Sequence, residues 1–299
     1  MPELSGTLQR TAPTPVRRSM RQFPTRRLMT VGRGLLVGLA LAAVLIPLAW
    51  LFLTSVKYPN QLFQDPPVII PNKITFEHYR VLFANREFVN AAVNSLVVAG
   101  SATVISVILG AFAAYSLARL KLPWRLNGIL AGWFLLTRMY PAISTAIPYF
   151  LLIKTLGLLD TRMALIITYT GFNLSFVVWQ MIGYYQEVPA DLENAALVDG
   201  AGTIQTFFKV TTPVTLPGLL STAVFVFIMS WNEFLFAVIL TSINTKTLPV
   251  SIAGFITDKN LAWSEMSAFS MLTIIPVVAF ALATQRYLVR GLTMGAVKG

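Results

Sequence analysis

The chain has 299 residues, of which 56% are hydrophobic and only 12% are charged. Because a soluble domain typically carries about 25% charged residues, this composition excludes an ordinary soluble domain and indicates a surface that faces lipid. The chain has no cysteine and one histidine, His78, which excludes a disulfide framework and a Cys/His metal cluster. The net charge of +11 indicates membrane topology rather than nucleic-acid binding, because Lys and Arg mark cytoplasmic loops.

The N-terminal stretch is rich in Arg, Thr and Pro. We expect residues 1–30 to form a disordered basic cytoplasmic tail. Such a tail either contacts anionic lipid head groups or only sets the orientation of the first helix. We expect residues 31–299 to form one transmembrane domain that ends in a cytoplasmic tail over 290–299.

Apolar runs long enough to cross a membrane, which takes about 20 residues, follow along the chain. One of them contains a single charge, Arg138. Prolines at 141, 148, 217 and 276 are expected to kink or break the helices that contain them. The predicted fold is all-α, a polytopic membrane protein with about six transmembrane helices, near 34–56, 89–118, 126–153, 163–185, 213–240 and 267–289.

The distribution of Lys and Arg predicts the orientation. The N-terminal tail, residues 119–125, residues 186–212 and the C-terminus together carry 14 Lys and Arg, and the opposite loops carry 8. Positive charge is retained on the cytoplasmic side of a membrane. Both termini and residues 186–212 are therefore predicted to be cytoplasmic, with 57–87 and 241–266 outside, as in a multi-pass protein of a bacterial or archaeal plasma membrane.

The loop 186–212 is the longest predicted cytoplasmic connection. Pro189 suits the first position of a helix and Gly200 suits the position after its end, which predicts a helix of about three turns. A second short helix over 204–210 is expected to end before Pro213. On the first helix a small apolar face is shared by Leu192, Ala195, Ala196 and Asp199, with Glu193 beside it. This face either receives another protein, with Glu193 pairing with a cation on that partner, or packs under the chain's own membrane domain.

The same loop resembles the EAA loop of binding-protein-dependent ABC importer permeases. The matching residues are Glu193, Ala195, Asp199, Gly200, Ala201, Phe207, Val210 and Pro213, whereas Asn194 and Thr212 depart from the pattern. Residues 285–299 look like the C-terminal signature of carbohydrate importer permeases related to the second maltose permease. Thr137–Pro141 and Trp231–Glu233 also resemble that family, so the similarity covers roughly residues 35–299.

The resemblance implies a type I ABC importer permease and a set of partners. The chain has no P-loop, so it is not expected to be an enzyme or to bind a cofactor; ATP and Mg would be bound by two partner ATPase subunits. A second related permease and an extracytoplasmic solute-binding protein are also implied. The coupling contacts to the ATPases would come from Leu192, Glu193, Ala195, Ala196, Asp199 and Gly200, and C-terminal contacts from Thr293, Gly295, Ala296 and Lys298.

Few ionisable residues lie within the predicted spans, and intramembrane charge is expensive enough to suggest function. Arg138 could bind solute or pair with Glu233, or both could be structural. The remaining candidates for a solute pathway are Tyr140, Tyr149, Tyr169, Asn173, Trp231 and Asn232, which could equally be packing residues. The family expectation for the solute is a sugar or related polyol. An ion-coupled secondary transporter, with Glu233 as its buried acid, and a membrane scaffold remain alternatives.

Overall fold

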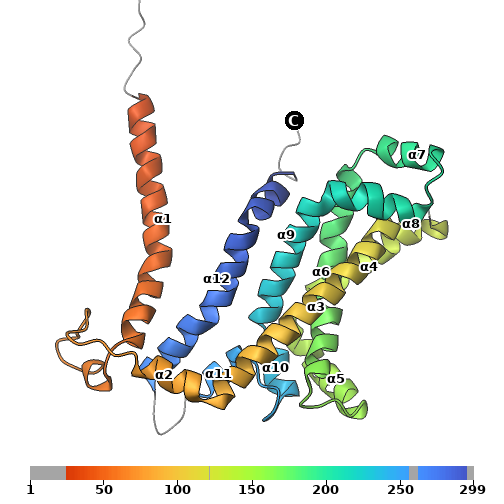
Figure 1. The fold of residues 1–299 in the computed structure, drawn as a ribbon. Coiled ribbons are helices and arrows are strands. Elements are labelled where there is room, and N and C mark those ends of the chain that lie inside the picture. The colour runs from red at the N-terminus through yellow and green to blue at the C-terminus, as the bar shows by residue number, and fades with distance from the viewer. Residues whose placement is uncertain (1–24, 121, 256–261, 295–299) are drawn as a thin grey trace, which may run out of the picture. The chain divides into compact units, whose positions relative to one another are not determined.

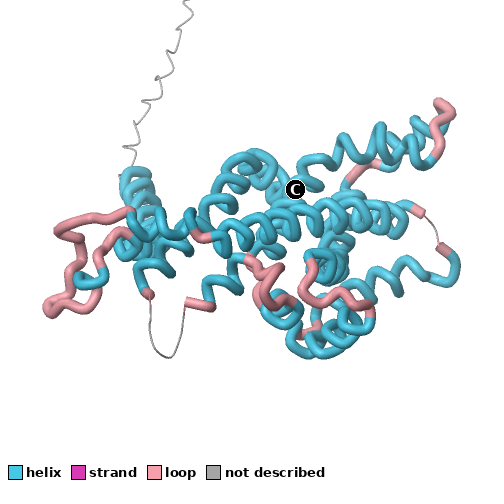
Figure 2. Tube along the Cα trace, turned by 60° about the horizontal axis from the view of Figure 1, so that its bottom comes forward, coloured by secondary structure: helices cyan, strands magenta, loops and turns pink. Residues whose placement is uncertain are grey.

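The computed structural model describes residues 25–120, 122–255 and 262–294. Those residues form helices joined by loops, with one isolated backbone bridge between Lys57 and Ile74 and no strand (Figure 2). The chain divides into two units, residues 1–49 and residues 50–299. The first helix, α1 (Thr25–Ser55), supplies the described part of the first unit and extends into the second. It begins inside the predicted tail, of which residues 1–24 lie outside the described residues.

The second unit is a helix bundle (Figure 1). The long helices α3, α6, α9 and α12 run side by side, α7 and α8 lie at one end, and α2, α5, α10 and α11 lie towards the other. The bounds are α2 Glu77–Ala84, α3 Arg86–Arg119, α4 Leu126–Met139, α5 Ala142–Thr155, α6 Arg162–Glu187, α7 Ala190–Val198, α8 Thr203–Thr206, α9 Thr212–Trp231, α10 Leu235–Leu240, α11 Leu248–Ala253 and α12 Trp263–Met294.

Close helix packing in this bundle depends on two glycines. A Cβ at Gly110 of α3 would lie 2.5 Å from the Val177 side chain of α6, and one at Gly218 of α9 would lie 2.7 Å from the Tyr184 ring. Helices in lipid gain little from the hydrophobic effect and rely on van der Waals contact, so small residues let their backbones approach. Gly110 and Gly218 therefore set the spacing of α6 from α3 and α9.

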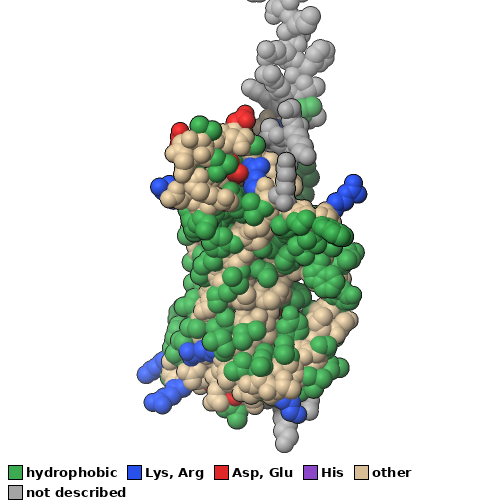
Figure 3. Space-filling view, turned by 90° about the vertical axis from the view of Figure 1, so that its right-hand side faces the viewer, with side chains coloured by type: hydrophobic (Ala, Val, Ile, Leu, Met, Phe, Trp, Pro, Cys, Tyr) green, Lys and Arg blue, Asp and Glu red, His purple; other side chains and the backbone are tan. Residues whose placement is uncertain are grey.

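Helices long and apolar enough to cross a membrane begin at Met29, Arg86, Arg162, Thr203 and Trp263, which makes five among the described residues. On one face of the molecule, hydrophobic side chains cover the middle, while Lys, Arg, Asp and Glu gather towards the two ends (Figure 3). This arrangement agrees with the predicted all-α polytopic membrane fold. Five of the six predicted spans correspond to these helices.

The predicted span over 126–153 is wrong as a single helix, because α4 ends at Met139 and α5 begins at Ala142. Each of these helices has 14 residues, or about 21 Å, which is shorter than the ~30 Å hydrocarbon core of a bilayer. Pro141 lacks an N–H and pushes the preceding Tyr140 into an extended conformation, with ψ of 132°. The break is therefore local and is set by the Tyr140–Pro141 pair.

The predicted span over 213–240 also differs from the structure. It divides into α9 and α10, because the Glu233 carboxylate accepts the N–H groups of Phe236 and Ala237 at 2.8 and 3.1 Å and so starts a new helix. At the other end, the short helix expected to stop before Pro213 instead continues into α9. A π-helical turn over Phe207–Thr211 shifts the carbonyls that the Pro213 ring would otherwise meet.

Candidate coupling surface and solute cavity

The sequence of α7 contains its own start and stop signals. Pro189 stands before the helix in an extended conformation, and Gly200 follows it with φ of +87°. The Gly200 N–H donates to the Leu197 carbonyl at 3.1 Å and the Ala201 N–H donates to the Ala196 carbonyl at 2.9 Å. These two bonds form a Schellman motif, which favours glycine at this position. The predicted helix and its glycine terminator are confirmed.

The predicted face of α7 is open to solvent in this chain. Leu192 is 46% exposed, Ala195 and Asp199 are exposed, and Ala196 is partly exposed. Two neighbours that the prediction omitted, Leu197 and Val198, are 50% and 87% exposed. Apolar side chains this exposed on a helix outside the bundle are typical of a surface that another protein covers.

Glu193 points the other way and is buried, at 8% exposure. Its carboxylate accepts the Arg119 Nε–H at 3.1 Å and the Thr211 hydroxyl at 2.7 Å, while Arg119 also donates to the Val188 carbonyl at 2.5 Å. The prediction that Glu193 could pair with a cation on a partner therefore fails here, because its cation comes from the end of α3 of the same chain. These four residues are called the Glu193 clasp below.

Aromatic rings lie beside the clasp. Phe207 packs against Phe112 and Tyr115 of α3, each at 4.9 Å between ring centroids, and against Tyr185 of α6 at 6.2 Å. Phe207 belongs to the π-helical turn that leads into α9. A displacement of α7 would therefore act on α3 through Arg119 and on the base of α9 through Thr211.

The C-terminal candidates cannot be placed. Gly295, Ala296 and Lys298 lie outside the described residues, and only the backbone of Thr293, in α12, is described.

A cavity of about 400 Å³, called the pathway cavity below, lies where the α4–α5 and α9–α10 breaks meet the bundle. Arg138, in the last turn of α4, and Glu233, in the break after α9, both line it. Irregular backbone is tolerated at membrane depth where it borders a cavity. The other lining residues are Tyr169, Phe172, Asn173, Met229, Ser230 and Phe236.

The charged groups of the pathway cavity are not paired with each other. The Arg138 guanidinium lies 5.8 Å from the Phe172 ring centroid and 5.3 Å from that of Phe176. No ion pair joins it to Glu233 in the described part of the chain, so the predicted pair is wrong. Glu233 is held by the α10 amides.

Polar groups complete the wall of this cavity. Asn173 donates to the Ser230 hydroxyl at 2.9 Å. The buried Tyr169 hydroxyl lies near the Glu233 carboxylate, but it makes no hydrogen bond of normal geometry within the described residues. An uncharged hydroxyl that is buried without a partner costs free energy unless a ligand or water satisfies it. The arrangement can therefore bind a polar solute.

The other predicted pathway residues lie elsewhere. Trp231 is 3% exposed; its Nε1–H donates to the Thr273 carbonyl at 3.3 Å and its ring stacks on Phe227, so it is a packing residue. Asn232 is exposed and donates to the Ile228 carbonyl of its own helix at 2.8 Å. Tyr140 and Tyr149 border a different cavity.

Prediction missed Phe172, Met229, Ser230 and Phe236. Of these four residues, only Ser230 could have been predicted from the sequence. It lies three residues before Glu233 in the predicted span and hence on a similar helical face. No group of three or more His, Cys, Asp or Glu side chains lies together among the described residues in a way that could hold a metal ion.

At the far end of the bundle, one carboxylate organises a turn. Asp160 accepts the N–H groups of Ser242, Ile243, Asn244 and Thr245 at 3.0 to 3.3 Å and the Thr245 hydroxyl at 2.9 Å. Burial alone would raise the pKa of Asp160, but these donors outweigh it and hold the pKa well below its usual range. The turn after α10 is thereby fixed to the α5–α6 connection.

Comparison with known proteins agrees with this architecture. Residues 106–294 match the family of binding-protein-dependent transport system inner membrane components, and the chain belongs to that family. It is 40% identical to the trehalose transport system permease protein of Mycobacterium tuberculosis over 87% of this chain and 95% of that one. It is 34% identical to the trehalose/maltose transport system permease protein of Thermococcus litoralis over 89% of this chain and 96% of that one.

A solved structure shares the fold. A chain of a bacterial ABC transporter involved in the import of the acidic polysaccharide alginate superposes with a TM-score of 0.74, at 24% identity, over 92% of this chain and 99% of that one. The protein is thus a multi-pass membrane permease of the ABC importer type, and the permease resemblance found in its sequence is confirmed.

Proposed function

We propose that this chain is the permease subunit of an ATP-driven importer of a sugar, and that α7 is where ATP hydrolysis on partner subunits is coupled to transport. The single observation that carries the coupling proposal is the two-sided character of α7. One side is exposed and apolar, and the other is fixed to the bundle through Glu193. A helix that only packed under its own domain would bury its apolar side.

The partners follow from this assignment. Two ATPase subunits would receive α7 of this chain and the matching helix of a second permease, and Thr293, Gly295, Ala296 and Lys298 would extend between them. Both termini and α7 would then be cytoplasmic. An extracytoplasmic binding protein would deliver solute to the opposite end, where the turn held by Asp160 exposes 82% of Ile243.

Sugar transport is supported by the two relatives named for trehalose and maltose. The pathway cavity offers such a solute an amide, hydroxyls and aromatic rings. The ion-coupled alternative has no support in these comparisons. The Glu233 carboxylate has a structural role instead, because it accepts two backbone N–H groups at the start of α10.

The test is transport by the complete complex in proteoliposomes, assembled with its second permease, ATPases and binding protein. Uptake of labelled trehalose should require ATP and survive collapse of the proton gradient. Ala196→Trp should abolish the stimulation of ATP hydrolysis by loaded binding protein, because a large ring would overpack the docking face. Thr155→Trp, at the exposed end of α5, is the matched control.

Normal stimulation in Ala196→Trp would show that α7 is not the coupling element. Uptake that followed the proton gradient instead of ATP would overturn the importer assignment itself. Deleting residues 293–299 separates the C-terminal contact, since it should lower coupled transport while the protein still inserts. Full transport after the deletion would remove that contact from the proposal.

A further inference from the structure

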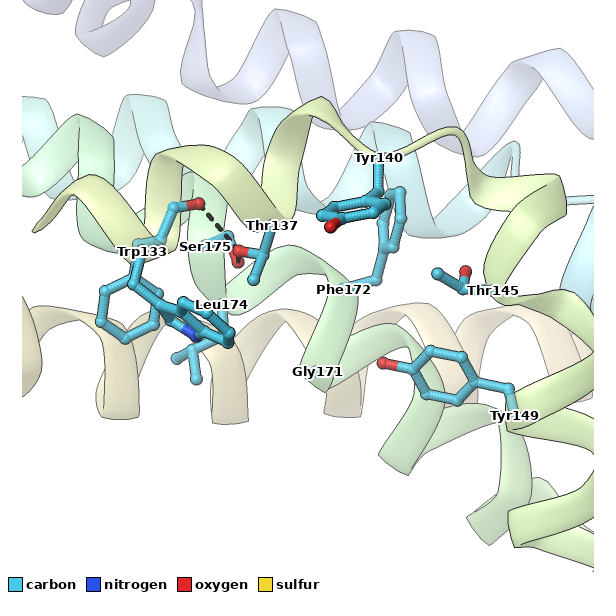
Figure 4. A pocket seen from close by; sticks show the side chains of 10 residues that line it. Trp133, Thr137, Tyr140, Thr145, Tyr149, Gly171, Phe172, Leu174 and Ser175 are labelled. Atoms are coloured by element: carbon cyan, nitrogen blue, oxygen red, sulfur yellow. Dashed lines mark hydrogen bonds between the residues drawn. The ribbon is translucent and has the colours of Figure 1, made fainter. Parts of the chain in front are cut away.

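A second cavity, of about 280 Å³, opens beside the α4–α5 break (Figure 4). Its lining residues include Trp133 and Tyr140 at the rim, each 63% exposed, and Thr137, Tyr149, Phe172 and Ser175. None of the side chains that line it is charged. It is called the hydroxyl cavity below, to distinguish it from the pathway cavity with its Arg138 and Glu233.

The polar side of the hydroxyl cavity is a pair of hydroxyls with defined roles. Thr137 Oγ1 donates to the Phe134 carbonyl at 2.8 Å, and the Thr137 and Ser175 hydroxyl oxygens are 2.7 Å apart. Since Thr137 has one hydrogen and gives it to the carbonyl, Ser175 is the donor in the second bond. Both oxygens keep lone pairs and neither keeps a free hydrogen. The pair is therefore suited to accept hydrogen bonds from a ligand that donates hydroxyl groups.

The apolar side consists of aromatic rings from three places in the chain. Trp133 and Tyr140 lie on either side of the last turn of α4, Tyr149 comes from α5 and Phe172 from α6. The Tyr149 hydroxyl lies close to Gly171, where an added Cβ would be 3.3 Å from it. A cavity with aromatic walls and a few converging hydroxyls matches a ring that has apolar C–H faces and a polar edge.

The two cavities share a wall, because Phe172 lines both. Thr137 and Arg138, which are adjacent in α4, line one cavity each. A volume of about 280 Å³ lies at the lower limit of the ~300–1,000 Å³ range of small-molecule sites, which suits a single sugar ring better than an oligosaccharide.

We propose that the hydroxyl cavity is a subsite for one uncharged sugar ring, next to the pathway cavity, with Ser175 and Thr137 as hydrogen-bond acceptors. This rests on the proposed function, sugar import, and adds that this permease contacts the solute through α4 and α6. A lipid tail is the competing occupant, but it would leave the buried Ser175 oxygen without a donor.

The absence of cysteine from the chain allows a direct test. Thr145→Cys places a thiol on the wall of the cavity, and Thr155→Cys places one on α5 outside it. Each variant is assembled into the complete complex and treated with an uncharged maleimide, with and without trehalose and in the absence of ATP. We expect trehalose to slow labelling at position 145 several-fold and to leave position 155 unchanged. Equal labelling at position 145 with and without trehalose would overturn the subsite. A thiol at position 145 that stays unreactive in both conditions would also overturn it, because lipid or the second permease would then cover the cavity.

A kinetic measurement tests the assigned acceptor. Ser175→Ala should raise the KM for trehalose about five-fold, the effect of one ordinary hydrogen bond, with kcat unchanged. Ser116→Ala, which removes a hydroxyl bonded only within α3 at the cytoplasmic end, is the control. An unchanged KM in Ser175→Ala would overturn the assignment. ATP-driven trehalose uptake by the unaltered complex is measured in parallel, so failure of the subsite and failure of the importer assignment give different results.

Discussion

Replacing Arg119 tests whether the Glu193 clasp holds α7 to the bundle. The Arg119 and Glu193 side chains are 16% and 11% exposed. Removing one member of a buried ion pair costs about 3–5 kcal/mol, and because these groups keep some solvent and Glu193 keeps the Thr211 bond, we expect about 2–3 kcal/mol for Arg119→Ala. The cost should appear as local opening of α7, because few other contacts hold that helix.

Hydrogen exchange of the α7 amides in the purified complex measures this opening directly. Arg119→Ala should speed exchange by about 30- to 160-fold, the equivalent of that free energy. Asp191→Asn, an exposed change on the same helix, should stay within ~0.5 kcal/mol. A double-mutant cycle with Glu193→Gln should show strong coupling between the two positions.

Solute-stimulated ATP hydrolysis should fall in Arg119→Ala, while the binding protein keeps its affinity for solute. The reasoning would be refuted by unchanged α7 exchange in Arg119→Ala, or by additive effects in the double mutant. Either result would mean that α7 is held by contacts other than the clasp.

Three further expectations concern packing, protonation and topology. Gly110→Ala should destabilise the protein by about 1–3 kcal/mol in thermal unfolding, because its Cβ would meet Val177. Gly100→Ala is the control and should be nearly neutral, because a Cβ there has open space. Equal effects of the two substitutions would contradict the packing argument. The pKa of Asp160 is lower in the folded protein than in the unfolded chain. The stability that its carboxylate contributes to the fold is therefore fully present above the unfolded-state pKa of about 3.9. It is lost only as the pH falls towards the folded-state pKa. The turn held by Asp160 should therefore resist proteolysis equally at pH 7 and pH 5. In Asp160→Asn the turn should be cleaved faster at both pH values. Faster cleavage of the unaltered protein at pH 5 than at pH 7 would disprove this. An impermeant thiol reagent added to intact cells should label Asn72→Cys but not Asn194→Cys; the reverse pattern would invert the proposed orientation.

The membrane spans could be predicted because a long apolar run without charge is rarely stable in any structure other than a membrane-spanning helix. The same holds for α7, whose helix start at Pro189 and terminator at Gly200 are local signals. Pro141 also indicated a break, although the sequence could not show that the break would leave two helices too short to span a membrane.

The rest depended on contacts between distant parts of the chain. Glu193 is buried because Arg119, 74 residues earlier, ends α3 beside it. Glu233 starts α10 instead of pairing with Arg138, because its carboxylate accepts the backbone N–H groups of the residues three and four positions later in the chain. Trp231 could not be assigned to the core from sequence, since aromatic residues serve equally in packing and in binding. Phe172, Met229 and Phe236 have no polar signal, so only their position in the bundle identifies them as cavity residues.

The continuity of the helix from Thr203 to Trp231 has a mechanical consequence. The π-helical turn lets this segment pass Pro213 with its helix unbroken, so its 29 residues form one continuous helix, which also contains Pro217. Thr211, near one end, belongs to the Glu193 clasp, and Ser230, near the other, lines the pathway cavity. Because no loop separates the two ends, a displacement at Thr211 is transmitted along hydrogen-bonded helical backbone to Ser230. A movement of α7 would therefore reach the polar wall of the pathway cavity through this helix.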